Sequence, residues 1–391
     1  MATPTKNKVV NGIVFTGKGY SYVLRVPDPV TGKTKPQWVG GFDTAKSAKL
    51  ARDKARVALS TDSYVSPSDI TLGEFLTKWV SELHNSQLKP TTLHSYKRVI
   101  TSYIIPGLGL IKLQDLRPSH LQSFYNDLLT KPNRSGRPLA PKSVEYAGAV
   151  LRIAIKYAVE VEGLLQNNPV TKIPLPKGKG VIPSPWNISE LNKFLDEARS
   201  HRLYCLFRLS AFTGARRGEL LALRWTDIDG TFLTISKSRT MAGNEVVEQN
   251  TTKGGTNGQR RIVLDPETIT ELKAHKKRLM DEAQKGLSLG YWNNSGYIFV
   301  QENGLPIDPH TPGHLFQKIS RKAGLRPIRF HDLRHLHATE LLRLGEPLHV
   351  VAQRLGHRDA MVTATIYAHV SDQQAETASS KFANAVNGVI S

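Results

Sequence analysis

The chain has 391 residues, of which 53 are Lys or Arg and 33 are Asp or Glu, so its formal net charge is +20. Such an excess favours a polyanionic partner, because each phosphate that a Lys or Arg neutralises releases condensed counterions. The single cysteine, Cys205, excludes a disulfide framework within the chain and a zinc site of several thiolates. The N-terminus is polar, and no run reaches the roughly eighteen apolar residues of a membrane helix. We therefore expect a cytoplasmic protein without a membrane partner.

Two polar, proline-containing stretches predict a division of the chain into three domains. Cuts after Tyr64 and after Leu175 give residues 1–64, 65–175 and 176–391, whose net charges are +7, +5 and +8. Because no single tail holds the positive charge, we expect an extended surface that wraps a long polyanion.

The first domain predicts a small sheet followed by a helix. Aromatic and β-branched runs separated by Gly and Pro indicate three short strands over residues 12–16, 20–26 and 37–42. A helix is expected over residues 44–59, with Thr44 as its N-cap. A sheet edge of this size fits a DNA groove, but a small domain whose charge only keeps it soluble has the same composition.

The second domain predicts helices. Thr71 and Glu74 form a capping box ahead of a helix whose Phe75 and Trp79 recur at helical spacing. These aromatic side chains are expected in the core rather than stacked on bases. Three further helices are expected over residues 90–104, from Pro118 onward, and over residues 141–162.

Five basic residues on these helices are candidate phosphate contacts. A Lys or Arg on a helix surface can bind a DNA phosphate, and a solvated helix face is the alternative for each of them. The five are Lys97, Arg98, Lys142, Arg152 and Lys156.

The third domain holds an arginine motif. TGARRGELLALRW, residues 213–225, predicts a Gly turn that presents Arg216 at the start of an amphipathic helix. Glu219 follows Arg216 by one turn, where it either orients its neighbours or makes a structural ion pair. An Arg in isolation is more often a surface residue, so the functional interpretation of Arg216 depends on the motif as a whole.

Three further motifs follow in order. HDLRHLHATELL places His331 and Arg334 three residues apart, on one face of a helix. LGH ends at His357, 26 residues after His331, and TATIYAHV places Tyr367 10 residues beyond His357.

Together these residues resemble the tyrosine recombinases, the family of phage and transposon integrases. The family's pattern is an Arg in a TGxRxxE helix, an HxxR pair, an LGH and a following nucleophilic Tyr, and all four occur here in order. The resemblance implies a multidomain, mainly α fold with small β-sheets. Its parts are an N-terminal three-stranded sheet plus helix for arm-type DNA, a helical core-binding domain, and an α+β catalytic domain with a C-terminal tail.

The resemblance also implies the activity and the partners. It implies a site-specific recombinase that cuts and rejoins double-stranded DNA through a 3′-phosphotyrosyl intermediate, and that integrates or excises a phage or mobile-element genome. Neither a metal nor another cofactor is required, because the covalent link keeps the energy of the broken phosphodiester. A homotetramer on core-type and arm-type sites, a host DNA-bending protein, an excision factor and the nucleoid of a bacterial cell are the implied partners and location.

The residue roles follow from the same resemblance. Permanently charged, bidentate guanidinium groups suit the charge that builds on the non-bridging phosphate oxygens. The implied roles are Arg216 and Arg334 as phosphate clamps, Tyr367 as nucleophile, His331 as base, His357 as a hydrogen-bond partner of the phosphate, and Glu219 as the residue that orients its neighbours.

The family's catalytic Lys, the acid for the departing 5′-oxygen, lies in a β-hairpin between the first Arg and the HxxR pair. Here residues 232–240 and 260–264 predict strands, and a Gly-rich turn lies between them. Lys253 in that turn is the best match, and Lys237 is the competitor.

Three other functions compete with this interpretation. A metallohydrolase is suggested by His331 and His335 at i and i+4, but no third ligand is evident. A binding-only relative is disfavoured by the intact motif residues. A type IB topoisomerase-like strand transferase uses similar residues, but the N-terminal arm-like domain and the LGH spacing favour recombination.

Overall fold

The computed structural model describes residues 9–357, apart from 11, 28–32, 62, 84–87, 134–135, 177–184 and 251–257. The chain forms two compact units, residues 1–180 and 181–391. The three-domain division expected from the sequence, with its cut after Tyr64, stays a prediction. Among the described residues, none of the helices combines the length and the apolar character that spanning a membrane requires.

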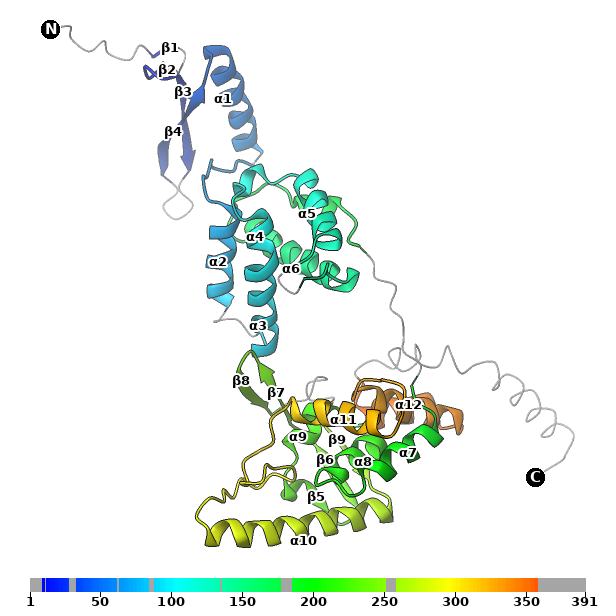
Figure 1. Cartoon of the computed structure of the whole chain (residues 1–391). Coiled ribbons are helices and arrows are strands. Elements are labelled where there is room, and N and C mark those ends of the chain that lie inside the picture. Colours follow the sequence, from blue (N-terminus) through cyan, green and yellow to red (C-terminus); the bar gives the residue numbers. More distant parts are fainter. Residues whose placement is uncertain are drawn as a thin grey trace, which may run out of the picture. The chain divides into compact units, whose positions relative to one another are not determined.

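The first unit begins with an antiparallel sheet in the order β1-β2-β3-β4, against which helix α1 packs (Figure 1). Ile13 and Leu24 of the sheet are buried together with Ala48 of the helix. Thr44 accepts a hydrogen bond from the Ser47 N–H, which confirms the predicted N-cap. The three longer strands are those predicted, and β1 adds a fourth of two residues. The bounds are β1 (Val9–Val10), β2 (Ile13–Phe15), β3 (Tyr20–Pro27), β4 (Thr34–Phe42) and α1 (Ala45–Ser60).

Helices form the rest of this unit. Phe75 and Trp79 are buried in its core, and the Thr71–Glu74 capping box is present, as predicted. The second predicted helix contains a wider π turn that ends two residues before Pro106, whose ring and missing N–H interrupt the regular ladder of helical hydrogen bonds. The bounds are α2 (Leu72–Glu82), α3 (Pro90–Val99), η2 (Ile100–Ile104), α4 (Ile105–Leu108), η3 (Leu113–Asp115), α5 (Pro118–Thr130), α6 (Pro141–Glu160) and η4 (Pro169–Lys172).

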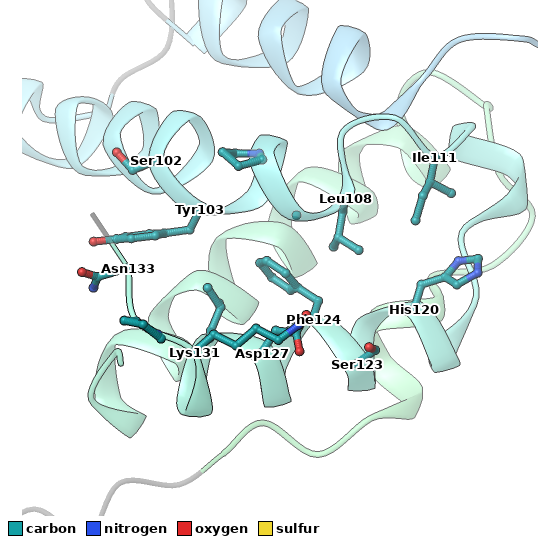
Figure 2. Close-up of a pocket in the computed structure, with 14 residues that line it drawn as sticks. Ser102, Tyr103, Leu108, Ile111, His120, Ser123, Phe124, Asp127, Lys131 and Asn133 are labelled. Atoms are coloured by element: carbon teal, nitrogen blue, oxygen red, sulfur yellow. Dashed lines mark hydrogen bonds and ion pairs between the residues drawn. The ribbon is translucent and has the colours of Figure 1, made fainter. Parts of the chain in front are cut away.

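A cavity of about 760 Å³ opens among these helices, between the η2–α4 segment and α5 (Figure 2). Leu108 and Phe124 contribute apolar lining, and His120 contributes a polar group. Asp127 and Lys131, which form an ion pair of 2.8 Å, also line it. The described catalytic candidates all belong to the other unit.

The second unit packs helices around two small sheets, with the orders β5-β6-β9 and β7-β8. Phe194, Phe207 and Phe316 contact one another ring to ring in its core, and Cys205 is buried beside them, as expected. The predicted mainly α class with small sheets is confirmed. The bounds are α7 (Ile188–Ala198), α8 (Tyr204–Thr213), α9 (Arg217–Ala222), η5 (Trp225–Asp227), β5 (Ile228–Asp229), β6 (Phe232–Ile235), β7 (Ser238–Ala242), β8 (Glu245–Gln249), β9 (Arg260–Val263), α10 (Pro266–Ser288), α11 (Thr311–Lys322), α12 (Asp332–Arg343) and α13 (Leu348–Leu355).

The predicted strand over residues 232–240 is two strands in the structure. β6 pairs with β9, and after a break at residues 236–237 the chain enters β7, which pairs with β8 instead. Gly243, with φ of 68°, supplies the tight turn of this hairpin. The Gly-Asn dipeptide at residues 243–244 was the sequence signal for it.

Candidate active site

Arg216 is positioned by a sharp turn between two helices. Helix α8 ends at Thr213 and is capped by Gly214, with φ of 62°, and Arg216 is the N-cap residue of α9, as predicted. Its N–H donates to Glu219 Oε2 (2.9 Å), and its Nη1 donates to Glu219 Oε1 (2.8 Å). Its Nη2 donates to the Gly356 carbonyl (3.3 Å), so the turn after α8 and the end of α13 meet at this guanidinium.

Arg334 joins the same two segments from α12. Its Nη1 donates to the Gly214 carbonyl (2.7 Å), and its Nη2 donates to the Leu355 carbonyl (2.6 Å). The residue is 3% exposed. Burial and the neighbouring charge of Arg216 lower the pKa of Arg334 to about 9, so the group is still a cation at neutral pH.

A buried carboxylate holds two of the guanidinium groups. Glu219 is 1% exposed, and Oε2 accepts a second hydrogen bond from Arg260 Nη2 (2.8 Å). Burial alone raises the pKa of Glu219, but the charges and hydrogen bonds of Arg260 and Arg216 outweigh it, so the pKa is lowered. Among the described residues, the ion pairs of Arg216 and Arg260 share this carboxylate, and the Arg334 guanidinium donates only to carbonyl groups. The cluster therefore keeps an excess of positive charge that suits an anion.

His331 is close enough to this cluster for the charges of Arg334 and Arg216 to act on its ring. It is the N-cap residue of α12, directly before the helix, rather than a residue within a helical face as the sequence suggested. The residue keeps an exposed surface. Desolvation of its ring, followed by the charges of His335, Arg334 and Arg216, nevertheless lowers the pKa of His331 to about 4. The imidazole is therefore neutral at pH 7.

His357 is positioned by the end of α13. Gly356 caps that helix with φ of 65°, and the His357 N–H donates to the Ala352 carbonyl (3.0 Å). Burial, followed by the charges of Arg334 and Arg216, lowers the pKa of His357 to about 4. The structure thus brings both predicted histidines, in neutral form, to the two predicted arginines.

Two further side chains belong to the cluster. Arg260 was missed from the sequence, and His335 was considered there only as a metal ligand. Arg260 on β9 is buried, and its signal was only a pair of adjacent Arg residues in a strand. The His335 ring lies 5.4 Å from the His331 ring, at an interplanar angle of 85°. Asp332 is 2% exposed and accepts hydrogen bonds from the N–H and side chain of Arg329, which fixes the turn into α12.

Two predicted catalytic residues, Lys253 and Tyr367, lie outside the described residues. The competing Lys237 lies in the break between β6 and β7 and is partly buried. In the described part of the chain, no group of three or more His, Cys, Asp or Glu residues could hold a metal ion.

The five predicted DNA contacts belong to the first unit and are not part of this cluster. Lys97 and Arg98 are exposed at the end of α3, and Arg152 is partly buried on α6. Two others have acidic neighbours on the same helix: Lys142 pairs with Glu145 at 2.9 Å, and Lys156 pairs with Glu160 at 3.6 Å.

The arrangement has a definite chemical capacity. Two guanidinium groups can stabilise the charge of a phosphodiester under attack, and neutral imidazoles beside them can accept or share a proton.

Family models match two parts of the chain. Residues 184–374 match the phage integrase family, and residues 71–129 match the N-terminal SAM-like domain of phage integrases. A "Tyrosine recombinase XerC-like" protein of Caldanaerobacter subterraneus subsp. tengcongensis is 31% identical, over 85% of this chain and 87% of the relative. The ICEBs1 integrase of Bacillus subtilis is 27% identical, over 88% of this chain and 90% of the relative.

Solved structures share the fold. The chain matches a lambda integrase dimer bound to a core site with a TM-score of 0.58 and 20% identity, over 93% of this chain and 96% of the other. It matches the Tn1549 transposon integrase in complex with DNA with a TM-score of 0.65 and 18% identity, over 80% of this chain and 99% of the other. Together with the geometry above, these matches show that the chain belongs to the tyrosine recombinase family, described also as the phage integrase family, and is a site-specific recombinase.

Proposed function

We propose that this site cuts and rejoins DNA through a covalent link to Tyr367, and that the chain integrates or excises the genome of a phage or other mobile element. The observation that carries the proposal is the convergence of Arg216, Arg334, His331 and His357 in one positively charged cluster. Tyr367 follows His357 by 10 residues, as in the motif order of the family.

In the cleavage step, the Tyr367 phenol oxygen attacks the phosphorus, and the bond from phosphorus to the 5′-oxygen breaks. The bonding electrons leave with the 5′-oxygen, which takes a proton from Lys253. The products are a 3′-phosphotyrosyl link and a free 5′-hydroxyl. Attack by a 5′-hydroxyl from a second duplex reverses the step and joins the strands.

Arg216 and Arg334 stabilise the charge that develops on the non-bridging oxygens. His331 accepts the phenol proton, for which its neutral form is required, and the incoming phosphate charge makes the imidazole more basic. His357 donates a hydrogen bond to the phosphate. Glu219 orients Arg216 through the two hydrogen bonds described above.

The partners are inferred from related proteins. A lambda integrase tetramer bound to a Holliday junction has the same fold, and relatives include an integrase of Staphylococcus phage L54a. Four protomers on two duplexes with core-type and arm-type sites are therefore the proposed assembly. A host DNA-bending protein, an excision factor and the bacterial nucleoid complete the proposal.

The nucleophile is tested with a duplex that carries the core site and a nick close to the cleavage position. After cleavage, the short strand with the free 5′-hydroxyl diffuses away. Religation is then impossible, and the covalent complex accumulates. Tyr367→Phe removes only the hydroxyl, so we expect covalent capture to be abolished while the Kd for DNA stays within about twofold. Tyr291→Phe, at an exposed tyrosine, is the control and keeps full capture. Capture by the Tyr367→Phe protein would show that another residue is the nucleophile.

A further inference from the structure

Arg260 contacts three separate segments of the catalytic unit with one guanidinium group. Its Nη2 donates to Glu219 Oε2 (2.8 Å), its Nε donates to the Arg354 carbonyl (2.6 Å), and its Nη1 donates to the Gly258 carbonyl (3.1 Å). The Arg260 side chain is only 5% exposed. All three of its nitrogen atoms are therefore used inside the protein.

Each of these contacts leads to a different part of the site. Glu219 is also the carboxylate that holds Arg216. Arg354 lies three residues before His357, at the end of α13. Gly258 is the first described residue after the segment that contains Lys253.

The turn before His357 packs directly on this guanidinium. A Cβ atom added to Gly356 would lie 2.8 Å from Arg260 Nη1 and 3.2 Å from Cδ. The left-handed glycine therefore lets the end of α13 approach Arg260 as closely as it does. A smaller or differently shaped side chain on β9 would leave this turn without its support.

Arg261, the next residue, gives the contrast. It lies on the opposite face of β9, where its side chain is 51% exposed, pairs with Asp229 at 2.7 Å and stacks on the Phe232 ring. The strand thus presents two chemically identical side chains, of which only Arg260 faces the site.

We infer that Arg260 is a positioning residue of the recombinase, which holds Arg216, the turn before His357 and Gly258 in place relative to one another. The planar guanidinium group of Arg260 holds its N–H donors in fixed directions, whereas the ammonium group of a Lys does not. Arg260 acts through these neighbours and does not itself touch the phosphate. The inference rests on the proposed function of Arg216 and His357.

The test compares Arg260→Lys and Arg261→Lys, which make the same chemical change on opposite faces of one strand. The rate of covalent capture is measured in a single turnover on the nicked core-site duplex at saturating DNA, and the Kd for the duplex is measured separately. We expect Arg260→Lys to lower the rate at least tenfold, with the Kd within about threefold. Arg261→Lys should keep its rate within about twofold of the parent chain. Equal rates for the parent and Arg260→Lys chains would overturn the inference, as would an equal loss in both variants.

A double-mutant cycle with Glu219→Gln distinguishes the positioning role of Arg260 from a purely structural role. If Arg260 acts through Glu219, the Arg260→Lys change lowers the rate much less in the Glu219→Gln background than in the parent chain. Rates are expressed per folded molecule, with the folded fraction taken from circular dichroism. Independent, multiplicative effects of the two substitutions would contradict the inference. If the parent chain itself captures no duplex, the proposed function fails, whatever Arg260 does.

Discussion

The charge states of individual side chains at this site follow from guanidinium groups packed with little compensating negative charge. Glu219 is ionised because the charges and hydrogen bonds of Arg260 and Arg216 outweigh its burial. Burial, followed by neighbouring positive charges that include Arg334 and Arg216, disfavours protonation of His331 and His357. A phosphodiester in the cluster supplies the missing negative charge. The excess positive charge of the cluster therefore attracts an anionic group.

The assignment of the acid makes a chemical prediction for Lys253. Replacing the bridging 5′-oxygen of the scissile phosphate by sulfur gives a leaving thiol with a pKa of about 8.5, which departs as a thiolate without a proton donor. Lys253→Ala should therefore lose at least a hundredfold in capture rate on ordinary DNA and recover most of it on the sulfur substrate. Lys237→Ala, the matched control, should cleave both substrates at the parent rate. The reverse pattern would make Lys237 the acid.

His275 makes a prediction about stability and pH. It is 2% exposed, its Nε2 hydrogen bonds the Ile298 carbonyl at 2.8 Å, and Arg278 approaches its Nδ1 at 2.6 Å. Burial lowers its pKa from 6.5 to about 4. Between these values the unfolded chain binds the proton and the folded chain does not, so the free energy of unfolding falls as the pH falls from 6.5 to 4. The slope from this group approaches about 1.4 kcal/mol per pH unit.

His275→Gln isolates that contribution, because a Gln amide can donate to the Ile298 carbonyl and accept from Arg278 but does not titrate. Urea unfolding between pH 7 and pH 4 should show a shallower loss of stability in the variant, and the two curves should converge toward low pH. If the two plots of unfolding free energy against pH were parallel over that range, the pKa of His275 would have to be the same in the folded and unfolded chains.

At the scale of the elements, two glycine-capped helix ends make the site. Gly214 caps α8 and Gly356 caps α13, both with positive φ. The Gly214 carbonyl accepts a hydrogen bond from Arg334, and the Gly356 carbonyl accepts one from Arg216. A Cβ atom on Gly214 would lie 2.5 Å from Leu355 Cδ2. The close approach of these helix ends therefore depends on the absence of side chains.

Gly356→Ala tests this dependence. The left-handed φ costs about 1 kcal/mol for an Ala, and the contact with Arg260 adds about 1–3 kcal/mol. Gly230→Ala is the control, because Gly230 has a similar φ of 58° but nothing lies within 4 Å of an added Cβ atom. Urea unfolding should show the larger loss for Gly356→Ala, together with a capture rate at least tenfold lower. Equal losses of stability would mean that α13 moves aside without cost.

Elements that depend on neighbours along the chain were predictable from the sequence. The caps at Thr44 and Thr71 and the start of α9 at Arg216 are where local patterns place them. The burial of Arg260 was not predictable, because strand alternation sends Arg260 and Arg261 to opposite faces without saying which face α9 and α13 cover. The break between β6 and β7 was also not predictable, because the residues there suit one long strand as well as two short strands.

At the scale of the whole molecule, the net charge of +20 is far larger than catalysis requires. Arg216, Arg334 and Lys253 account for only a small part of it, and the rest is distributed along the chain. Exposed cations that bind phosphates release counterions. Each such contact therefore steepens the slope of log affinity against log salt concentration by about 0.9. The salt dependence therefore measures which basic residues bind DNA.

The predicted contacts differ in what surrounds them, and the slope should reflect this. Lys97 and Arg98 are exposed, so Lys97→Gln with Arg98→Gln should reduce the slope by about 2. Lys142 and Lys156 must leave Glu145 and Glu160 to bind a phosphate, so their paired replacement by Gln should reduce the slope by less.

The control for charge alone is the replacement of two lysines of α10, Lys273→Gln with Lys277→Gln, which lowers the net charge by the same amount at exposed positions that no motif assigns to DNA. The Kd of each variant for a core-site duplex is measured by fluorescence anisotropy between 50 and 300 mM salt. Long-range electrostatic fields are progressively screened over this range, and all the slopes are obtained under the same conditions. An unchanged slope for the α10 variant and a reduced slope for the Lys97 and Arg98 variant would identify local phosphate contacts. An equal reduction in all three variants would mean that the overall field, rather than these contacts, holds the DNA, and the assignment of Lys97 and Arg98 would then be wrong.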